Sequence, residues 1–233
     1  MSELLGIYAG GLRALEPEGQ ATGMFKQPLE RAEVTRLGIA GDQQADRRIH
    51  GGPDKALHEF ARVSYTAIAQ SFPALVAAAV PGTLGENLSS AERDDATVCI
   101  GDTLRIGGAL VQVSQPRRPC WKINHRFDCR ELSHFIERRQ LTGWYYRVLE
   151  PGVIALGDRI ELLERADPGV TIAAFTRTVT AHRPEADALN VLINAHGLSE
   201  EWRARLTRRR DYLARRRGAG RVSPAAGDNT NTE

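Results

Sequence analysis

Cys120 stands in the stretch of the chain whose residue types best suit chemistry. From Ser114 to Lys122 the sequence reads Ser-Gln-Pro-Arg-Arg-Pro-Cys-Trp-Lys, so three cations flank the thiol. Positive charge favours the thiolate, which is the form that binds metals and attacks electrophiles. Pro116 and Pro119 exclude a helix and predict an extended or turning backbone where the thiol stands. The alternative is a structural cysteine beside a cationic turn, because free cysteines are commonly core residues.

Two polar loops that contain glycine accompany this stretch. Residues 41–55 read Gly-Asp-Gln-Gln-Ala-Asp-Arg-Arg-Ile-His-Gly-Gly-Pro-Asp-Lys, and residues 83–88 read Thr-Leu-Gly-Glu-Asn-Leu. Both have many side chains that can hydrogen-bond and few core formers, and such loops carry function more often than fold. A structural alternative exists for each, since acid–arginine neighbours can form weak surface ion pairs and Asn can cap its own turn.

The other cysteines and histidines offer no second site. Cys99 lies between two apolar residues of a predicted strand and is expected in the core, and Cys129 precedes a predicted helix and is assigned a structural role. Three cysteines without C-x-x-C spacing argue against a zinc knuckle and against a disulfide framework. No metal-ligand spacing with partners is found at His58, His125, His134, His182 and His196.

The composition is that of an ordinary globular protein, with 233 residues of which 42% are hydrophobic and 26% charged. The net charge of +2 conceals an arginine-rich last third, which we interpret as a solvated helix face rather than a nucleic-acid site, since aromatic residues do not interleave it. No apolar run approaches the ~18 residues of a membrane span. The N-terminus lacks the pattern of a signal peptide. We therefore expect a cytoplasmic protein without a membrane partner.

The elements that position the polar stretches are predicted to be mostly strands. Strands are expected over residues 4–12, 31–39, 56–60, 98–100, 103–106, 109–114, 144–149 and 153–163, the last in two parts or bent. Residues 20–28 are expected to form a loop, and helices are expected over residues 63–72 and 130–140. Cys120 would thus follow a hairpin strand directly.

A helical pattern begins after the Asp-Pro-Gly boundary at residues 167–169. Proline, glycine and serine at suitable end positions predict helices over residues 170–179, 184–194 and 199–208. A module of about 50 residues is small for independent stability, so it should pack on the β domain. The predicted fold class is predominantly β (α+β). The predicted units are a β domain (1–166), a three-helix domain (167–217) and a disordered tail (218–233).

Taken in order, four stretches resemble a MOSC domain, a family named after the C-terminal domain of molybdenum cofactor sulfurases. These stretches are residues 41–47, 50–57, 85–88 and 116–122. The chain is most similar to the YiiM-like branch, which adds a C-terminal three-helix domain. The resemblance covers residues 1–210 and is specific because several spaced motifs occur in the right order.

The resemblance implies a MOSC-type, barrel-like β domain with short helices, followed by a small three-helix domain. It also implies a molybdenum cofactor (molybdopterin) with Cys120 as metal ligand, and reduction of N-hydroxylated compounds such as hydroxylaminopurines and amidoximes. Because the sequence carries no signature for flavin, haem, iron–sulfur or nicotinamide binding, the two electrons would come from a separate electron-donor protein. The helical domain could gate the site, form a homodimer or recruit that donor.

The residue chemistry agrees with this implication. A soft thiolate suits molybdenum, cations and glycine-rich amide nests suit a phosphate, and polar side chains suit a pterin. Asp46 is expected to be catalytic beside Cys120, as a proton donor or outer ligand, because removing oxygen as water consumes protons. The residues expected to bind the cofactor are Asp42, Arg47, His50, Gly51, Gly52, Lys55, Gly85, Asn87, Arg117, Arg118 and Lys122, with Arg48 as a further cation.

Two rival functions remain open from the sequence. Cys120 could carry sulfur as a persulfide, for which a reactive thiolate also serves. Alternatively, the chain could be a non-catalytic binding module that uses its arginine-rich C-terminal helices, with binding that weakens steeply with salt.

Overall fold

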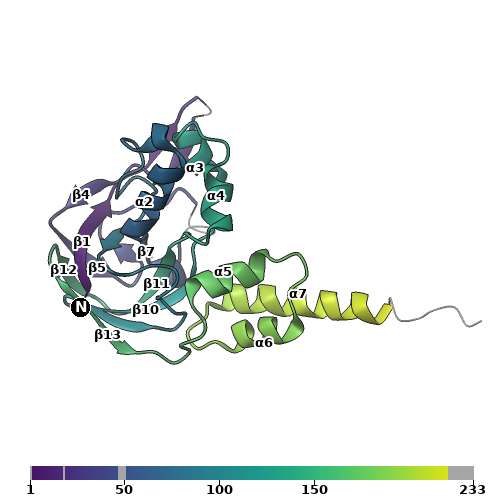
Figure 1. The fold of residues 1–233 in the computed structure, drawn as a ribbon. Coiled ribbons are helices and arrows are strands. Elements are labelled where there is room, and N and C mark those ends of the chain that lie inside the picture. The colour runs from purple at the N-terminus through teal and green to yellow at the C-terminus, as the bar shows by residue number, and fades with distance from the viewer. Residues whose placement is uncertain (1, 18, 47–50, 220–233) are drawn as a thin grey trace, which may run out of the picture.

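A closed barrel of strands forms the centre of the molecule (Figure 1). The computed structural model describes residues 2–17, 19–46 and 51–219. In hydrogen-bonded order the barrel strands are β13 (Arg159–Glu164), β9 (Thr103–Ile106), β10 (Ala109–Pro116), β11 (Trp144–Glu150), β7 (Leu57–Glu59), β8 (Leu88–Ser90) and β1 (Ser2–Ala9). The barrel closes because Ser2 and Glu3 of β1 pair with β13. Closure leaves these strands without the open edges that invite aggregation.

Short strands and turns lie outside the seven barrel strands. β4 (Gln27–Leu29) extends the sheet beside β1, and β2 (Arg13–Leu15) pairs with β3 (Gln20–Thr22). β12 (Gly152–Ala155), β5 (Arg31–Thr35) and β6 (Gly38–Ile39) form a separate three-stranded sheet. The 3-10 turns η1 (Pro53–Lys55) and η2 (Pro73–Leu75) each begin at a proline, whose fixed φ suits a first helical position.

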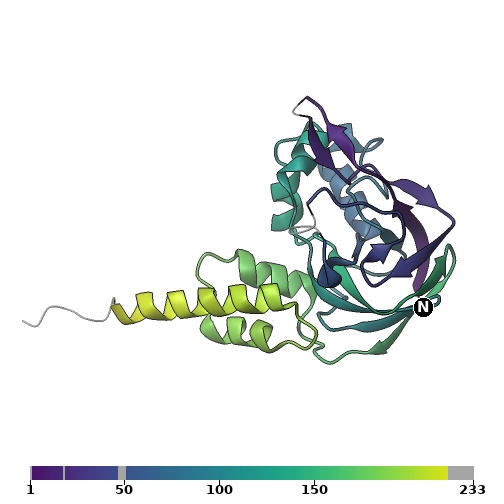
Figure 2. The same ribbon diagram turned by 180° about the vertical axis from the view of Figure 1, so that it is seen from behind.

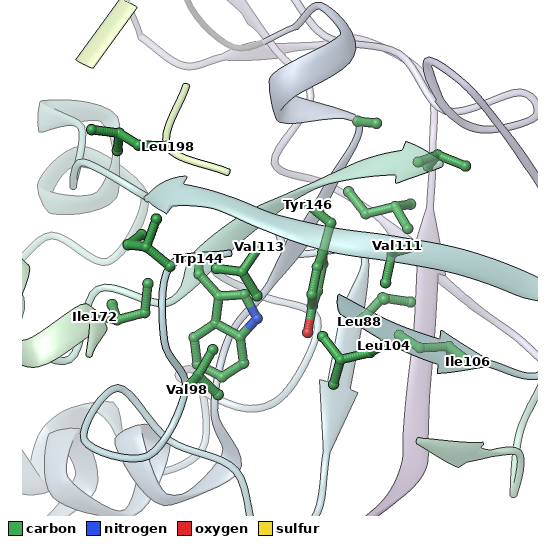
Figure 3. Packing of buried hydrophobic residues seen from close by; sticks show 14 of the residues in the cluster. Leu88, Val98, Leu104, Ile106, Val111, Val113, Trp144, Tyr146, Ile172 and Leu198 are labelled. Carbon is green, nitrogen blue, oxygen red and sulfur yellow. The ribbon is translucent and has the colours of Figure 1, made fainter. Parts of the chain in front are cut away.

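The barrel interior is packed with large side chains from β9, β10 and β11 (Figure 3). Val111 and Val113 of β10 alternate inward beside Trp144 and Tyr146 of β11, and all four are fully buried. Each such side chain contributes about 1.5–3 kcal/mol through burial. The Tyr146 hydroxyl donates a hydrogen bond to buried Glu59, so the polar end of this aromatic residue is satisfied in the core.

Three helices cover one side of the barrel and share a second core (Figure 1). They are α2 (Arg62–Ser71), α3 (Trp121–Arg126) and α4 (Leu132–Arg138). Tyr65 and Ile68 of α2 are buried with Ile123 of α3 and with Leu132 and Ile136 of α4. This apolar contact fixes α3, and therefore the residue that precedes it, against the barrel.

The C-terminal helices form a module that projects from the barrel in both views (Figures 1 and 2). They are α5 (Ile172–Thr180), α6 (Ala186–Asn194) and α7 (Glu200–Ala219). Their inner residues Ile172, Phe175 and Trp202 belong to the same buried cluster as the barrel residues Val113 and Trp144. The module therefore packs on the β domain, as its small size predicts.

Most predicted elements are confirmed within a few residues, including the strands around Cys120 and the first two C-terminal helices. Three predictions are wrong. The predicted loop 20–28 contains β3 and β4, and residues 98–100 form only an isolated bridge between Cys99 and Thr171. α7 continues to Ala219 instead of ending at Arg208, because residues 209–217 contain neither glycine nor proline, so residues 218 and 219 are not tail. The rest of the predicted tail, 220–233, lies outside the described residues.

The sequence did not predict α3. Pro116 and Pro119 do keep residues 116–120 extended, but the helix begins at the very next residue, Trp121. Proline excludes a helix before itself and does not prevent one from starting just after it.

Candidate functional site

A cleft beside the end of β10 brings the polar stretches together. It encloses about 640 Å³, including its open mouth. Its walls come from β3 and the chain that follows, the 42–45 loop, η1, β7, the 84–87 loop, β11, and the junction between β10 and α3. The lining residues are Thr22, Gly23, Met24, Lys26, Asp42, Gln43, Gln44, Ala45, Lys55, His58, Leu84, Gly85, Asn87, Arg117, Cys120, Lys122 and Tyr145.

Cys120 lies between the end of β10 and the start of α3. It is the residue that caps the N-terminus of α3, with an extended backbone (φ −102°, ψ 147°), and its carbonyl accepts a hydrogen bond from the Ile123 amide at 2.9 Å. Pro116 is still paired with Trp144 of β11, so both flanks of this junction are anchored. The thiol is partly exposed and lines the cleft. A metal or small molecule in the cleft could therefore reach it.

Four cationic side chains line the cleft with Cys120, namely Lys26, Lys55, Arg117 and Lys122. Lys122 donates to the Ala21 carbonyl at 2.7 Å, which ties α3 to the β3 strand. Lys26 pairs with Asp42, and both side chains are almost completely buried. Burial lowers the pKa of Lys26, although Asp42 acts in the opposite direction.

Arg117 is the most deeply placed of these cations. Its side chain is buried, and Nη2 donates to the Leu84 carbonyl at 3.1 Å. Nη1 makes no hydrogen bond with any described residue. A buried guanidinium with an unused donor is costly unless a partner satisfies it. Beside it, burial raises the pKa of Tyr145, while the charge of Arg117 acts to lower it.

Asp42 and Asn87 form a hydrogen-bonded wall of the cleft. Asn87 Nδ2 donates to Asp42 Oδ2 at 2.9 Å and to the Tyr8 carbonyl at 3.1 Å, and Asn87 Oδ1 accepts from the His58 amide at 3.1 Å. Asp42 Oδ1 also accepts from the Gly10 amide at 2.9 Å. These two side chains therefore join β1, β7 and both polar loops. The hydrogen bonds of Asn87 therefore differ from those of a residue that caps its own turn, which is the structural alternative for this side chain.

Glu86 stabilises the second polar loop, residues 83–88, through hydrogen bonds from buried groups. Its carboxylate is fully buried and accepts hydrogen bonds from Tyr65 and from the amides of Gly82 and Leu84. Burial raises the pKa of Glu86. Gly85 next to it has φ +84°, and a Cβ there would lie 3.2 Å from Met24 Cγ. A glycine is thus required at the point where this loop approaches the opposite wall.

Seven of the predicted site residues lie together in the cleft: Asp42, Lys55, Gly85, Asn87, Arg117, Cys120 and Lys122. Asp46, Gly51 and Gly52 are described but are not part of its lining. Arg118 faces a different cavity, between the barrel and the helical module. The predicted residues Arg47 and His50, with the neighbouring cation Arg48, lie outside the described residues.

Lys26, Tyr145 and His58 are among the cleft residues that sequence reasoning missed. Lys26 lies in the stretch assigned to a loop, Tyr145 reads as an ordinary strand residue, and His58 was assigned no role. None has a neighbour in sequence that signals a site. The alternation of β11 could have found Tyr145, since it lies between inward-facing Trp144 and Tyr146 and must face the other side of the strand.

The helical module also reaches the cleft. Glu201, in the first turn of α7, pairs with Lys55 through a contact of 2.6 Å between Oε2 and Nζ. The Glu201 side chain is 65% exposed, whereas that of Lys55 is only 8% exposed. A residue of the C-terminal module thus sets the electrostatic surroundings of a cation in the cleft.

A closed β-barrel with a cysteine at the strand–helix junction and polar glycine loops beside it defines the class of protein. The MOSC domain family matches residues 46–161. The chain belongs to this family. Within it, the chain is 36% identical to Protein YiiM of Escherichia coli (strain K12), a match that covers 88% of this chain and 91% of that protein.

Two further proteins are similar to much of this chain. The crystal structure of YiiM from Geobacillus stearothermophilus superimposes with a TM-score of 0.76 at 27% identity, covering 90% of this chain and 99% of that one. A protein of Gibberella moniliformis named "Reductase" is 32% identical over 80% of this chain and 34% of its own length. The predicted YiiM-like fold, a barrel with a C-terminal helical module, is confirmed. Within the described ranges, none of the helices combines the length and apolarity needed to cross a bilayer.

Proposed function

We propose that this protein is a molybdenum-cofactor-dependent reductase of N-hydroxylated compounds, with Cys120 as the metal ligand. The observation that carries the proposal is the accessible Cys120 thiol in a cleft lined by four cations, within a chain of the MOSC family. The reductase name of the fungal relative supports the reaction class.

The residues of the cleft fit such a cofactor. A thiolate is a suitable ligand for a soft metal centre, and Lys55, Lys122 and Arg117 offer positive charge to an anionic group. The unused Nη1 of buried Arg117 is a donor that a bound anion would satisfy. Gly85, with its positive φ, lets the backbone approach a ligand closely. The cofactor would supply two-electron transfer at the metal.

The remaining side chains bind, orient and shield. Asp42 and Asn87 hold the two loops in register through their mutual hydrogen bond, so their contribution is to position the wall of the cleft. Tyr145, which is buried next to Arg117, keeps its proton well above neutral pH and can donate a hydrogen bond toward the cleft. We propose Asp46, which directly follows the lining residue Ala45 but is not itself part of the lining, as the proton source for the released oxygen. A separate electron-donor protein is the proposed source of electrons.

The molybdenum content of protein from a host that makes the cofactor tests the metal role. Elemental analysis should find near-stoichiometric molybdenum in the wild type and less than about a tenth of it in Cys120→Ala, because the thiolate is the protein's direct ligand. Cys129→Ala is the matched control and should retain the metal, since Cys129 is not part of the cleft lining. Full metal retention and activity in Cys120→Ala would refute the proposal.

The substrate class is tested separately on the metal-loaded protein. Reduction of benzamidoxime and of 6-N-hydroxylaminopurine, with a chemical reductant in place of the donor protein, should proceed in the wild type and cease in Cys120→Ala. Bound molybdenum without reduction of either compound would keep the cofactor role and reject the substrate class.

A persulfide carrier is the second candidate, favoured by the same partial exposure of the thiol. It expects a +32 Da adduct on Cys120 after incubation with a sulfur donor, removable by thiols. Molybdenum-free protein that forms the adduct would favour this function, whereas persistent absence of the adduct would count against it.

A further inference from the structure

A second cavity borders the segment that precedes Cys120, between the barrel and the helical module. It encloses about 940 Å³, including its open mouth. Residues 116–119 form one wall, and α4, α5 and α7 supply the others. Its lining residues are Pro116, Arg117, Arg118, Pro119, Glu137, Thr142, Thr176, Val179, Thr180, Trp202, Arg205, Leu206 and Arg209. We call this cavity the interdomain groove.

The charged groups of the interdomain groove are strongly unbalanced. Four arginines line it, against Glu137 as the one carboxylate among its described lining residues. Arg118 makes no hydrogen bond or ion pair with a described residue. Arg205 lies over the Trp202 ring at 4.8 Å from its centroid. Burial and the neighbouring charge of Arg118 lower the pKa of Arg205, whereas the charge of Glu201 acts in the opposite direction, so positive charge outweighs negative charge here.

Thr176 provides an independent sign that the groove accommodates a ligand. Threonines inside a helix commonly donate to the carbonyl four residues earlier. Thr178, Thr180 and Thr207 of this module do so. Thr176 is only 3% exposed, yet its hydroxyl makes no hydrogen bond with any described residue. A buried hydroxyl without a partner is costly, and Thr176 lines the groove beside the arginines.

The rest of the lining suits an organic ligand rather than a bare ion. Pro116, Pro119, Val179 and Leu206 give the groove apolar wall next to its cations. Guanidinium groups bind phosphate through paired N–H donors, and a hydroxyl can satisfy a further oxygen. A tetrahedral phosphate presents more acceptor oxygens and more negative charge than a carboxylate does, which matches several arginines and one hydroxyl.

We propose that the interdomain groove binds a small phosphorylated organic molecule, with Arg118 and Arg205 binding its phosphate and Thr176 donating to a phosphate oxygen. Arg209 is already engaged with the carbonyls of Val179 and Ala181 at the end of α5, so it orients that end and adds long-range charge. The ligand would lie against residues 116–119, which end at Cys120. The groove is separate from the Cys120 cleft, and Arg117 is shared by the linings of both.

Calorimetric titration of the full-length protein with phenyl phosphate and with inorganic phosphate, at constant ionic strength, tests this site. We expect one site in the groove, beside any anion binding by the cations of the Cys120 cleft, and tighter binding of phenyl phosphate in the groove because the apolar wall adds contact. Arg118→Gln and Arg205→Gln should each weaken binding at least tenfold, and Thr176→Val, which keeps the side-chain shape, should weaken it about threefold. Equal affinity for both probes would identify free phosphate as the ligand.

Two control variants separate this site from general charge and from the cleft. Arg215→Gln removes an exposed charge ten residues beyond Arg205 in the same helix, and Lys122→Gln removes one from the Cys120 cleft; neither should change the phosphate affinity of the groove. Absence of binding would overturn the proposal, as would unchanged affinity in folded Arg118→Gln and Arg205→Gln. Binding of a polyglutamate peptide, but of neither phosphate probe, would identify an acidic protein surface instead and would also overturn it.

Discussion

The role of the charged residues Asp42 and Lys26 follows from their burial more than from their neighbours in sequence. Asp42, expected to contact a cofactor, directs its carboxylate oxygens to Lys26, Asn87 and the Gly10 amide. Its side chain and that of Lys26 are 1% and 4% exposed. Removing one member of a buried pair is more damaging than the pair is stabilising, because the other charge stays buried. Asp42 therefore supports the cleft structurally, whatever the cleft binds.

A pH-dependent stability is expected from Asp95, which is buried between the barrel and α5. Its Oδ1 accepts from Thr142 and Gly143, while Oδ2 has no partner among the described residues. Burial raises the pKa of Asp95 from 3.8 to about 7. Unfolding then releases a proton between those values, so the free energy of unfolding falls as the pH rises from about 4 to 7, by at most ~4 kcal/mol.

Asp95→Asn should remove this dependence, because Asn keeps the acceptor at Oδ1 and carries no charge. Urea denaturation from pH 4 to 8 should show the variant gaining stability over the wild type as the pH rises. Glu150→Gln, at an exposed ion pair, is the matched control and should show a flat difference. A flat difference for Asp95→Asn as well would show that its pKa is not raised.

At the scale of elements, the segment between β10 and α3 decides where the chemistry can occur. It is extended, anchored to β11 on one side and to the second core through α3 on the other. The Cys120 cleft and the interdomain groove are both lined by residues of this segment. A ligand in the groove would therefore contact the backbone that carries the thiol.

The ion pair between η1 and α7 should be weak but measurable. Lys55 is buried whereas Glu201 is mostly exposed, so solvent screens the pair and its coupling energy should be about 0.2–1 kcal/mol. A double-mutant cycle with Lys55→Gln and Glu201→Gln, followed by urea denaturation, measures that coupling. Glu200→Gln is the control, since Glu200 contacts Arg203 of its own helix and should not couple to Lys55. Zero coupling for Glu201 would mean that the module does not influence this cation.

At the scale of the whole molecule, one buried cluster runs from the barrel into the helical module. Trp144 and Val113 of the barrel belong to it together with Ile172, Phe175 and Trp202 of the helices. A direct hydrogen bond from the Ser199 amide to the Ser114 carbonyl joins α7 to β10. Two units that share a core should unfold together, so we expect one cooperative transition.

Trp202→Ala tests this shared core. Trp202 is buried and packs edge-on against Phe175, with ring centroids 5.1 Å apart, so truncation should cost about 3–5 kcal/mol. Helical circular dichroism and Trp144 fluorescence should report the same, lowered urea midpoint. Tyr212→Ala, on the exposed side of the same helix, should change stability by less than about 0.5 kcal/mol. Loss of helical signal at a lower midpoint than Trp144 fluorescence would show that the module unfolds independently.

The sequence alone predicted most of the elements and singled out Cys120 as the proposed central residue. Alternating apolar residues predict most of the strands, and prolines predict the extended backbone before Cys120, because these signals are local in the chain. Gly85 and Gly52, singled out as glycines that permit unusual dihedrals, both have positive φ. Cys120 was distinguished by adjacent cations, which also need no knowledge of the fold.

Only the tertiary structure decided which side chains share a cavity. Lys26 and Glu201 lie far from Cys120 in sequence and reach the cleft because barrel closure and the packing of α7 bring them there. Arg117 and Arg118 are adjacent, yet Arg118 lines only the interdomain groove, whereas Arg117 is buried between the groove and the cleft. Successive side chains of an extended segment point to opposite faces. What lies on each face is set by long-range packing, which no local pattern encodes.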